Sequence, residues 1–397
     1  MEEIKLPIGF LASGIHCGIK EKSEKRDFGI VFSEIPGSCA GVFTKNKVKA
    51  VPVIITMERV KNGIAQAIVA NSGSANACTG ERGIKDALLI SQKVSKFLNI
   101  PEEYILLAST GIIGKPLPIE KIVPKIPLAI ENLSSKGGLA FQEAIMTTDK
   151  RPKFINKTIF VDNREITFTG IAKGSGMIHP QLATMLSFIL TDISISSFLL
   201  DKALKEVVEE TFNMISVDRD TSTNDTVLII ANGKAKNNEI IDENENYEIF
   251  KNTLKEVCIY LAKEIAKDGE GATKLIEVEV INASTKESAR ALAKSVVSSN
   301  LVKCAIYGQD ANWGRILCAL GYADSDFDPF KVDIYIGEIL IVKNGNGIDF
   351  EEKEVSNLLS RNFVKIKIDL KSGDYCATAW GCDLTEEYIR INAKYRT

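Results

Sequence analysis

The residues with the clearest chemical potential lie between Lys173 and Asp192, in the segment KGSGMIHPQLATMLSFILTD. Glycine and proline punctuate the segment up to Ala183, which predicts a loop, and the β-branched apolar run after it predicts a buried strand. Thr184 therefore stands at a loop-to-strand junction. Its hydroxyl group can attack the carbonyl group of Ala183 and shift the chain to an ester, and hydrolysis then leaves Thr184 as a new N-terminus.

An N-terminal threonine would carry its own base. An α-amine has a pKa of about 7.7–8.0, so near neutral pH it can take the proton of the hydroxyl group on the same residue. The chain has only two histidines, His16 and His179, that could serve instead. Taken alone, the Ala-Thr pair fits the start of an ordinary strand better than a cleavage site.

Small and hydroxyl residues follow two other predicted strands. IAQAIVA predicts a strand that leads into ten small or polar residues, Asn71 to Gly80, which fit a tight crossing of two elements as well as a site. YILLASTGIIG predicts a strand that ends at Thr110 and Gly111. Hydrogen-bond donors there would suit an oxyanion hole, and the same residues would suit a simple turn.

Two later loops carry carboxyl groups. The string DGEGATK follows a predicted helix and lacks the spacing of a phosphate-binding loop, and its Glu270 lies between two glycines, which suits the binding of a cation. The string SVDRDTSTNDT is rich in hydroxyl and carboxyl groups, and its pattern favours a solvated turn.

Length and charge limit the classes of function. The 397 residues suit two domains or one large duplicated α/β body, and 45% hydrophobic with 25% charged residues is typical of a globular protein. With 49 basic and 52 acidic residues interspersed, no basic field is expected to hold a nucleic acid or an anionic membrane. The N-terminus lacks the pattern of a signal peptide, and no stretch is long and apolar enough to span a membrane. A small-molecule substrate is therefore expected.

The eight cysteines are scattered without a CxxC pair or a Cys/His cluster. In a chain of this length they predict reduced, mostly buried thiols in a cytoplasmic protein, and no metal site is expected.

The apolar patterns predict an α/β protein of mixed sheets with flanking helices. Strands are expected in FGIVF, AGVF, VPVIIT, IAQAIVA, YILLASTG, KTIFV, EITFTG, residues 185–191, VLIIANG, IEVEVIN, VKCAIYG, KVDIYIGEILIVKNG, KIKIDL and CATAWGC. Helices are expected in IKDALLISQKVSKFLNI, parts of 120–145, LLDKALKEVVEETFNMI, a segment with one apolar face from Phe250 to Ile265, KESARALAKSVVSS and NWGRILCALGYA.

Nine motifs, in this order, give the chain a family resemblance: GVFTKN, ANSGSANACTG, STGIIG, MTTD, KGSGMIHPQLATML, DTSTNDT, DGEGATKLIEV, GQDANWGRI and AWGCDLTEEYIRINAKYRT. Together they span nearly the whole sequence. The chain resembles the self-processing ornithine acetyltransferases of arginine biosynthesis, also called glutamate N-acetyltransferases, and their layered fold, which self-cleaving aminopeptidases share.

The resemblance implies a cut between Ala183 and Thr184. Residues 1–183 would form an alpha fragment and residues 184–397 a beta fragment that begins with the nucleophile Thr184. The halves would intertwine, because the new N-terminus must lie beside groups from both, and two of each would form a heterotetramer.

The resemblance also implies a site and a reaction. Thr110 and Gly111 match the oxyanion-hole pair, and the substrate-binding positions match Thr147, Lys173, Thr184, Glu270, Asn392 and Thr397. An acetyl group would pass from N2-acetyl-L-ornithine to Thr184 and then to L-glutamate, with no cofactor. Lys173 would bind the α-carboxylate and Glu270 the ornithine ammonium. The sequence leaves open whether acetyl-CoA is also a donor.

Five residues at three places depart from the family pattern. Gln181-Leu182 replaces the usual Asn-Met, Arg219 replaces a glycine, and Lys150-Arg151 follows MTTD in place of a small residue. Two other functions remain as alternatives. One is a self-cleaving N-terminal-nucleophile aminopeptidase, in which water discharges the acyl-enzyme, and the other is an uncleaved binding protein.

Overall fold

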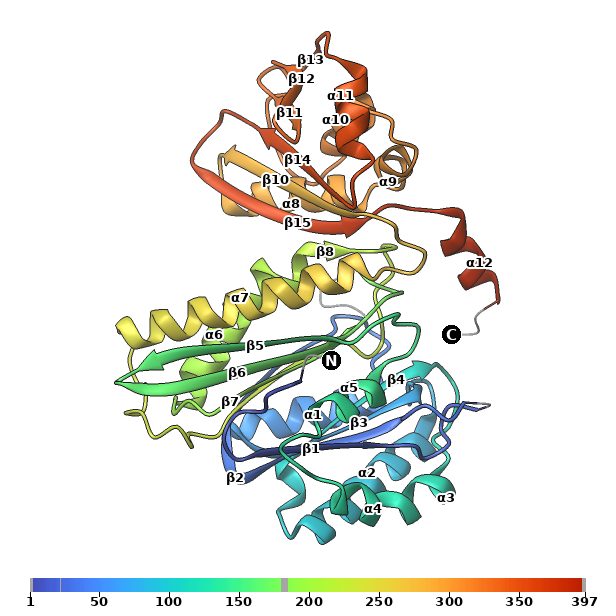
Figure 1. Ribbon diagram of the computed structural model, residues 1–397, viewed down its shortest axis with the longest axis vertical. Coiled ribbons are helices and arrows are strands. Elements are labelled where there is room, and N and C mark those ends of the chain that lie inside the picture. The colour runs from blue at the N-terminus through green and yellow to red at the C-terminus, as the bar shows by residue number, and fades with distance from the viewer. Residues whose placement is uncertain (1–2, 22, 180–184, 395–397) are drawn as a thin grey trace.

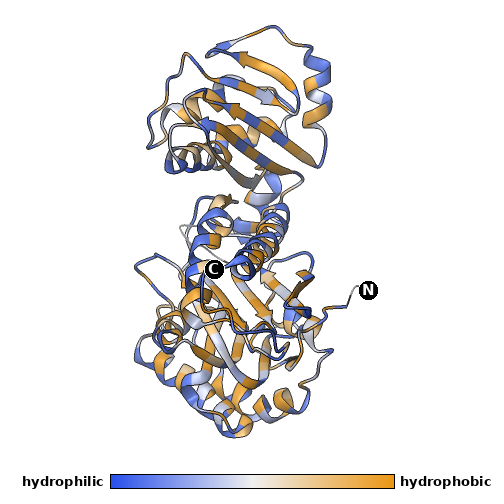
Figure 2. Cartoon of the chain, turned by 90° about the vertical axis from the view of Figure 1, so that its left-hand side faces the viewer, coloured by the Kyte–Doolittle hydropathy of each residue, from blue (hydrophilic) through white to orange (hydrophobic). Residues whose placement is uncertain are grey.

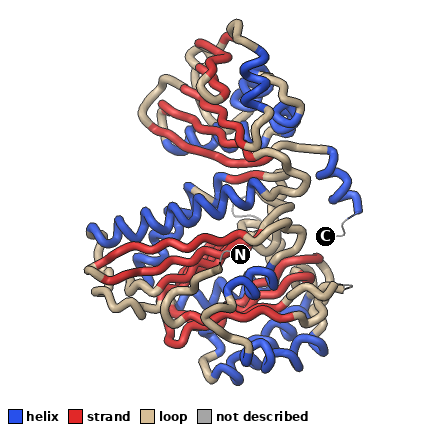
Figure 3. Tube along the Cα trace, in the orientation of Figure 1, coloured by secondary structure: helices blue, strands red, loops and turns tan. Residues whose placement is uncertain are grey.

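The computed structural model describes residues 3–21, 23–179 and 185–394. The chain forms a larger lobe around an eight-stranded mixed sheet and a smaller lobe around a seven-stranded mixed sheet (Figure 1). Helices flank both sheets, which confirms the predicted fold class (Figure 3). None of the helices in the described ranges is long and apolar enough to cross a membrane.

The larger sheet contains β1 (Phe10–Ile15), β2 (Phe28–Phe43), β3 (Ile64–Ser74), β4 (Ile105–Ile112), β5 (Lys153–Val161), β6 (Arg164–Lys173), β7 (Leu186–Thr191) and β9 (Thr226–Ala231). The smaller sheet contains β8 (Ile215–Ser216), β10 (Leu275–Ala283), β11 (Asp333–Ile336), β12 (Ile339–Lys343), β13 (Asn346–Gly347), β14 (Phe363–Asp369) and β15 (Tyr375–Cys382). The helices are α1 (Val51–Arg59), α2 (Gly80–Leu98), α3 (Ile119–Ile122), α4 (Ile126–Glu131), α5 (Gly138–Ile145), α6 (Ser197–Glu210), α7 (Glu245–Lys267), α8 (Lys286–Ser298), α9 (Asn300–Tyr307), α10 (Trp313–Gly321), α11 (Glu352–Leu359) and α12 (Glu386–Lys394).

The larger sheet interleaves strands from both halves of the chain. Its order is β4-β3-β2-β9-β7-β6-β5, with β1 paired to β2. Strands β7 and β9 come after residue 184, yet they lie between β2 and β6, which come before it. Strand β7 pairs antiparallel with β6 from Leu186 opposite Lys173, and parallel with β9 from Leu186 beside Thr226. The predicted intertwining of the two halves is therefore confirmed.

Helix α7 connects the two lobes. It packs on β5 and β6 of the larger sheet and also contacts β15 of the smaller sheet. In Figure 1 it lies between the lobes beside α6. Its N-terminus is capped by Asn244, whose side chain accepts a hydrogen bond from the backbone N–H of Tyr247 at 3.1 Å. The predicted apolar face from Phe250 to Ile265 is buried.

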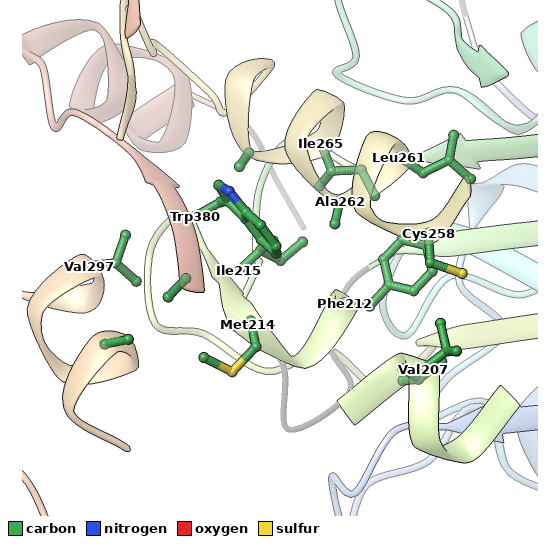
Figure 4. Close-up of a cluster of buried hydrophobic side chains, with 14 of the residues drawn as sticks. Val207, Phe212, Met214, Ile215, Cys258, Leu261, Ala262, Ile265, Val297 and Trp380 are labelled. Carbon is green, nitrogen blue, oxygen red and sulfur yellow. The ribbon is translucent and has the colours of Figure 1, made fainter. Parts of the chain in front are cut away.

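The largest hydrophobic cluster is continuous across this junction. Figure 4 shows Phe212 and Ile215 facing α7, and Trp380 of β15 on the other side of the same cluster. Hydrophobic residues gather on the strands and on one face of the helices (Figure 2). The lobes therefore share one core, which fixes the loops between them.

Two predicted strands are helices. VPVIIT lies in α1, where Pro52 occupies the first turn, a position that tolerates its missing N–H, and Val51 and Val53 pack inward. VKCAIYG lies in α9, which begins at a cap: the Ser299 hydroxyl accepts a hydrogen bond from the N–H of Val302. Both runs are short and β-branched, so their pattern does not separate a strand from a buried helix.

Truncating the shared core should destabilise the whole chain. Phe212 is fully buried, so Phe212→Ala is expected to lower the free energy of unfolding by about 3–5 kcal/mol. The matched control is Phe198→Ala, because Phe198 is 74% exposed and its loss should change stability by less than about 0.5 kcal/mol. Urea unfolding of both variants measures the difference, and equal effects would contradict a shared core.

Candidate active site

A pocket of about 310 Å³ lies where loops of the two halves meet. Six of the predicted site residues line it: Thr110, Gly111, Thr147, Lys173, Glu270 and Asn392. Ala183, Thr184 and Thr397, the other predicted site residues, lie outside the described ranges. Residues more than 280 positions apart in sequence thus meet in one pocket.

Thr110 and Gly111 are positioned by the end of β4. The Lys173 ammonium donates a hydrogen bond of 3.3 Å to the Thr110 hydroxyl oxygen, so the Thr110 proton is free to point at another acceptor. Gly111 has a φ of 131°, and a Cβ there would come within 2.5 Å of the Gly73 carbonyl carbon. Only glycine fits this position, and its backbone is held close to β3.

A buried ion cluster fixes the loop that carries Thr147. The Lys153 ammonium lies 2.6 Å from both the Asp149 and the Asp268 carboxylates, and Lys153 and Asp149 are fully buried. Asp149 also accepts hydrogen bonds from the backbone N–H groups of Thr147 at 3.0 Å and Gly174 at 2.7 Å. One carboxylate therefore holds two pocket segments in register.

Lys173 and Asp149 influence each other electrostatically. Burial lowers the pKa of the Lys173 ammonium, and the Asp149 carboxylate opposes that shift. Burial would raise the pKa of Asp149, but Lys173 and Lys153 hold it below its usual value. Lys173 is 3% exposed, so its charge is directed into the pocket with little screening by solvent.

The acidic side of the pocket is built by the loop after α7 and by α12. The Glu270 carboxylate accepts a hydrogen bond of 2.9 Å from the Asn392 side-chain amide. A Cβ on Gly176 would lie 2.4 Å from the Glu270 carboxyl carbon, so glycine is required for this approach. Beside them, the Tyr388 hydroxyl group donates a 3.3 Å hydrogen bond to the Asp218 carboxyl group. Burial raises the pKa of Asp218 above its usual value. Sequence reasoning missed Tyr388 and Asp218.

The start of β7 lies beside this pocket. Strand pairing places Leu186 opposite Lys173, and the backbone N–H of Met185 donates a 3.0 Å hydrogen bond to Asp225. The Asp225 side chain is fully buried, and burial raises its pKa well above the usual range. Its second carboxyl oxygen has no hydrogen-bond partner within the described ranges. The sequence suggested a solvated turn for SVDRDTSTNDT, and Ser222, Thr223 and Asn224 instead line the pocket.

The small-residue loop supports the pocket without lining it. Asn224 donates hydrogen bonds to the carbonyl groups of Ala75 and Ser109, at 2.7 and 2.8 Å, so it ties three chain segments together. Of the two interpretations of Asn71 to Gly80, the tight crossing agrees with this arrangement, and Asn71 to Ser74 continue β3.

Neither histidine lines the pocket. His179 lies 3.0 Å from the Ser216 hydroxyl, and burial, with Lys294 and Arg219, lowers its pKa to about 3, so it is neutral near pH 7. No group of three or more His, Cys, Asp or Glu side chains within the described part of the chain could hold a metal ion.

The departures from the family pattern are compatible with the structure where it describes them. Arg219 has a φ of 71°, which explains why a glycine suits that position, and its side chain points to solvent. Arg151 forms a 3.0 Å ion pair with Glu264 away from the pocket. Gln181 and Leu182 lie outside the described residues.

Fold and pocket together define an enzyme that acts on a small charged molecule. The ArgJ family model matches residues 11–397. The arginine biosynthesis bifunctional protein ArgJ of Caldanaerobacter subterraneus subsp. tengcongensis is 52% identical over 100% of this chain and 98% of that protein. The chain therefore belongs to the ArgJ family, and it is an acetyltransferase of arginine biosynthesis.

Two solved structures are also similar. The crystal structure of arginine biosynthesis bifunctional protein ArgJ from Bacillus halodurans is 48% identical, with a TM-score of 0.52, and covers 53% of this chain and 100% of its own. Ornithine acetyltransferase complexed with ornithine, from Mycobacterium tuberculosis, is 32% identical, with a TM-score of 0.40, over 46% of this chain and 96% of its own.

The ion cluster should stabilise the pocket. Lys153→Met leaves Asp149 and Asp268 buried without their cation, so the free energy of unfolding should fall by about 3–5 kcal/mol at pH 7. Because the Asp149 pKa is depressed, its contribution is present above about pH 4 and is lost as the pH falls further.

Urea unfolding at pH 7 and below pH 4 measures both effects. The variant should lose less stability on acidification than the wild type. The control is Lys157→Met, which breaks an exposed pair with Glu256 and should cost less than about 1 kcal/mol. Equal losses in the two variants would show that the buried cluster stabilises the fold no more than an exposed ion pair does.

Proposed function

We propose that the enzyme transfers the acetyl group of N2-acetyl-L-ornithine to L-glutamate, by way of an acetyl ester on Thr184, after it cleaves its own chain between Ala183 and Thr184. The observation that carries this proposal is the single pocket that collects Thr110, Gly111, Thr147, Lys173, Glu270 and Asn392 beside the start of β7.

The proposed chemistry begins with the Thr184 hydroxyl. Its proton passes to the α-amine of the same residue, since both histidines lie outside the pocket. The hydroxyl oxygen attacks the acetyl carbonyl, and the Thr110 hydroxyl with the Gly111 backbone N–H stabilises the oxyanion. Ornithine leaves with a proton on its α-amine. The glutamate amine then attacks the ester and restores the Thr184 hydroxyl.

The charges in the pocket suit these substrates. Acetylornithine carries an α-carboxylate and a side-chain ammonium, and the pocket offers the Lys173 ammonium and the Glu270 carboxylate, both largely buried. Ion pairs made away from water are strong, and their positions fix the orientation of the substrate. The acetyl group would then lie toward the oxyanion donors.

The same pocket would suit a hydrolase. The two functions differ in the molecule that takes the acetyl group from Thr184, which is glutamate in a transferase and water in a hydrolase. With labelled acetylornithine, a transferase forms acetylglutamate in proportion to added glutamate and releases little free acetate. An N-terminal-nucleophile hydrolase would release acetate at a rate that does not depend on glutamate, and that result would contradict the proposed function.

The roles of the two charged residues can be separated. Glu270→Gln removes the partner of the ornithine ammonium but keeps a hydrogen-bond acceptor for Asn392, so the KM for acetylornithine should rise about tenfold or more. The KM for glutamate, which lacks that ammonium, should change much less. Steady-state kinetics with each substrate varied in turn measures this, and equal rises would refute the assignment.

The cut chain is proposed to consist of residues 1–183 and residues 184–397, with two copies of each in a heterotetramer. The interleaved strands support a pair of fragments that stays together. Strand β9 is hydrogen-bonded to β2 and strand β7 to β6, and both β2 and β6 belong to the first fragment. The Bacillus halodurans chain is matched completely by about half of this chain, as expected for a protein cleaved near its middle.

The C-terminal segment is proposed to close the pocket through Asn392 and Thr397. Helix α12 reaches the pocket through Tyr388 and Asn392 but buries none of its own residues. Deleting Tyr395 to Thr397 should therefore lower activity while the urea unfolding midpoint stays unchanged. Full activity after the deletion would refute a role for the terminus.

The thiols and the names of the relatives concern the location of the protein and a second acetyl donor. All eight cysteines are free thiols, which supports a reducing, cytoplasmic location. The relatives are named bifunctional proteins, which supports a second acetyl donor, and we take this donor to be acetyl-CoA.

A further inference from the structure

A buried carboxyl group that the transfer reaction does not use lies directly behind the start of β7. Asp225 is 2% exposed, and it follows Asn224, which lines the pocket. One carboxyl oxygen, Oδ1, accepts the 3.0 Å hydrogen bond from the Met185 backbone N–H. The other oxygen, Oδ2, has no hydrogen-bond partner in the described part of the chain. A buried polar atom without a partner is costly, which points to a use beyond support of the fold.

The groups packed around this carboxyl group provide little to balance a negative charge. Lys173 on β6 is the charged side chain that acts on Asp225, and it interacts more strongly with Asp149. The Thr44 hydroxyl group, in the loop after β2, also lies close, but it donates its proton to the carbonyl oxygen of Ser222 at 2.7 Å. Burial therefore dominates and raises the pKa of Asp225 well above its usual value, which favours the protonated, neutral form.

The hydrogen bonds indicate which oxygen of Asp225 carries that proton. Oδ1 accepts from the Met185 N–H, so the acid proton belongs on Oδ2, the oxygen without a partner. Support of a backbone N–H requires only an acceptor. An amide side chain of the same size would provide one without an ionisable group in the interior. The carboxyl group thus offers a proton that the fold itself does not need.

The predicted cut lies close to this proton along the chain. Strand β7 runs parallel to β9 with Leu186 beside Thr226, and the Thr226 N–H donates a 3.1 Å hydrogen bond to the Met185 carbonyl oxygen. Met185 is therefore fixed beside Asp225 through both its N–H and its C=O. Thr184 lies outside the described residues, but its nitrogen comes one residue before the Met185 nitrogen, so the two atoms are at most about 3.6 Å apart.

Self-cleavage needs a proton donor that the transfer reaction does not need. Before the cut, the nitrogen of Thr184 belongs to a peptide bond, so it is no base, and it must gain a proton to leave. Neither histidine lines the pocket. We propose that Asp225 is the general acid of self-cleavage, which gives the proton on its free oxygen to the Thr184 nitrogen as the bond to Ala183 breaks. This inference rests on the proposed function, because it concerns the same cut.

The proposed step balances without another reagent. The Thr184 hydroxyl oxygen bonds to the carbonyl carbon of Ala183, the carbon–nitrogen bond breaks, and the nitrogen takes the Asp225 proton. The Asp225 carboxylate then recovers the proton that the hydroxyl group loses. Water hydrolyses the resulting ester to the Ala183 carboxylate and the free Thr184 hydroxyl group.

Cell-free synthesis of the full chain, sampled over time for the uncut fraction by intact mass, tests the proposal. Asp225→Asn keeps the size of the side chain and an acceptor for the Met185 N–H but lacks the acid proton, so cleavage should slow about 100-fold or more. Asp225→Glu keeps the proton on a longer side chain, so it should cleave more slowly than the wild type but faster than Asp225→Asn.

The matched control is Asp192→Asn, at the other end of β7. Asp192 is also fully buried with a raised pKa, but its two oxygens accept hydrogen bonds from the N–H groups of Ile8 and Thr167 at 3.0 and 2.8 Å. This variant should cleave at the wild-type rate. Thr184→Ala, which cannot cleave, gives the reference for the urea unfolding midpoint, and uncut Asp225→Asn should match it.

Hydroxylamine, which cleaves esters, identifies the blocked step. Asp225→Asn should stay uncut in hydroxylamine, because the proton is needed before the ester forms. Cleavage by hydroxylamine would place the block at ester hydrolysis and overturn the assigned role.

Cleavage of Asp225→Asn at the wild-type rate would overturn the inference and leave the proposed function standing. Uncut chains from both Asp225→Asn and Asp225→Glu would show that the junction needs the shape of Asp225 and not its proton, which also overturns the inference. An uncut wild-type chain would instead contradict the proposed function itself.

Discussion

The buried carboxylate of Asp149 is the constraint on which the pocket depends. It accepts hydrogen bonds from the N–H groups of Thr147 and Gly174 and lies 2.6 Å from Lys153, which bridges to Asp268 near the Glu270 loop. Three chain segments that line the pocket are thus joined through two carboxylates and one ammonium. Such a cluster adds little to the free energy of unfolding when it is compared with apolar side chains of similar volume. Removal of one partner leaves an unpaired buried charge, which is strongly destabilising, so the cluster fixes the relative positions of the segments it joins.

The interleaved sheet imposes the second constraint. Strand β7 pairs with β6 of the first half and with β9, which in turn pairs with β2 of the first half, so a cut just before β7 would release an N-terminus without releasing a fragment. The shared core around α7 holds the second lobe in place, so that α12 can bring Tyr388 and Asn392 to the same pocket.

Local patterns in the sequence predicted much of this fold. The apolar face of α7, the strand ending at Thr110 and Gly111, and the strand after Thr184 follow from periodicity and turn residues, and the structure confirms the described parts of each. VPVIIT and VKCAIYG were wrongly predicted as strands, because short β-branched runs have no decisive period.

Contacts between distant residues could not be predicted in the same way. Lys153 meets Asp268 across 115 positions, and Tyr388 meets Asp218 across 170. Neither pair has a local signal, since such contacts arise from tertiary packing. The family resemblance supplied the residues of the pocket, whereas the roles of Asp225 and Asp149 emerged only from the folded chain.

The central claim is that Thr184 becomes an N-terminal nucleophile. The most direct test is the intact mass of the purified protein under denaturing conditions, with N-terminal sequencing of any second fragment. Processing before Thr184 would give two chains of 183 and 214 residues, the second beginning Thr-Met-Leu. A single uncut chain in a preparation that transfers acetyl groups would contradict it, because the nucleophile and its base would then have to be other groups.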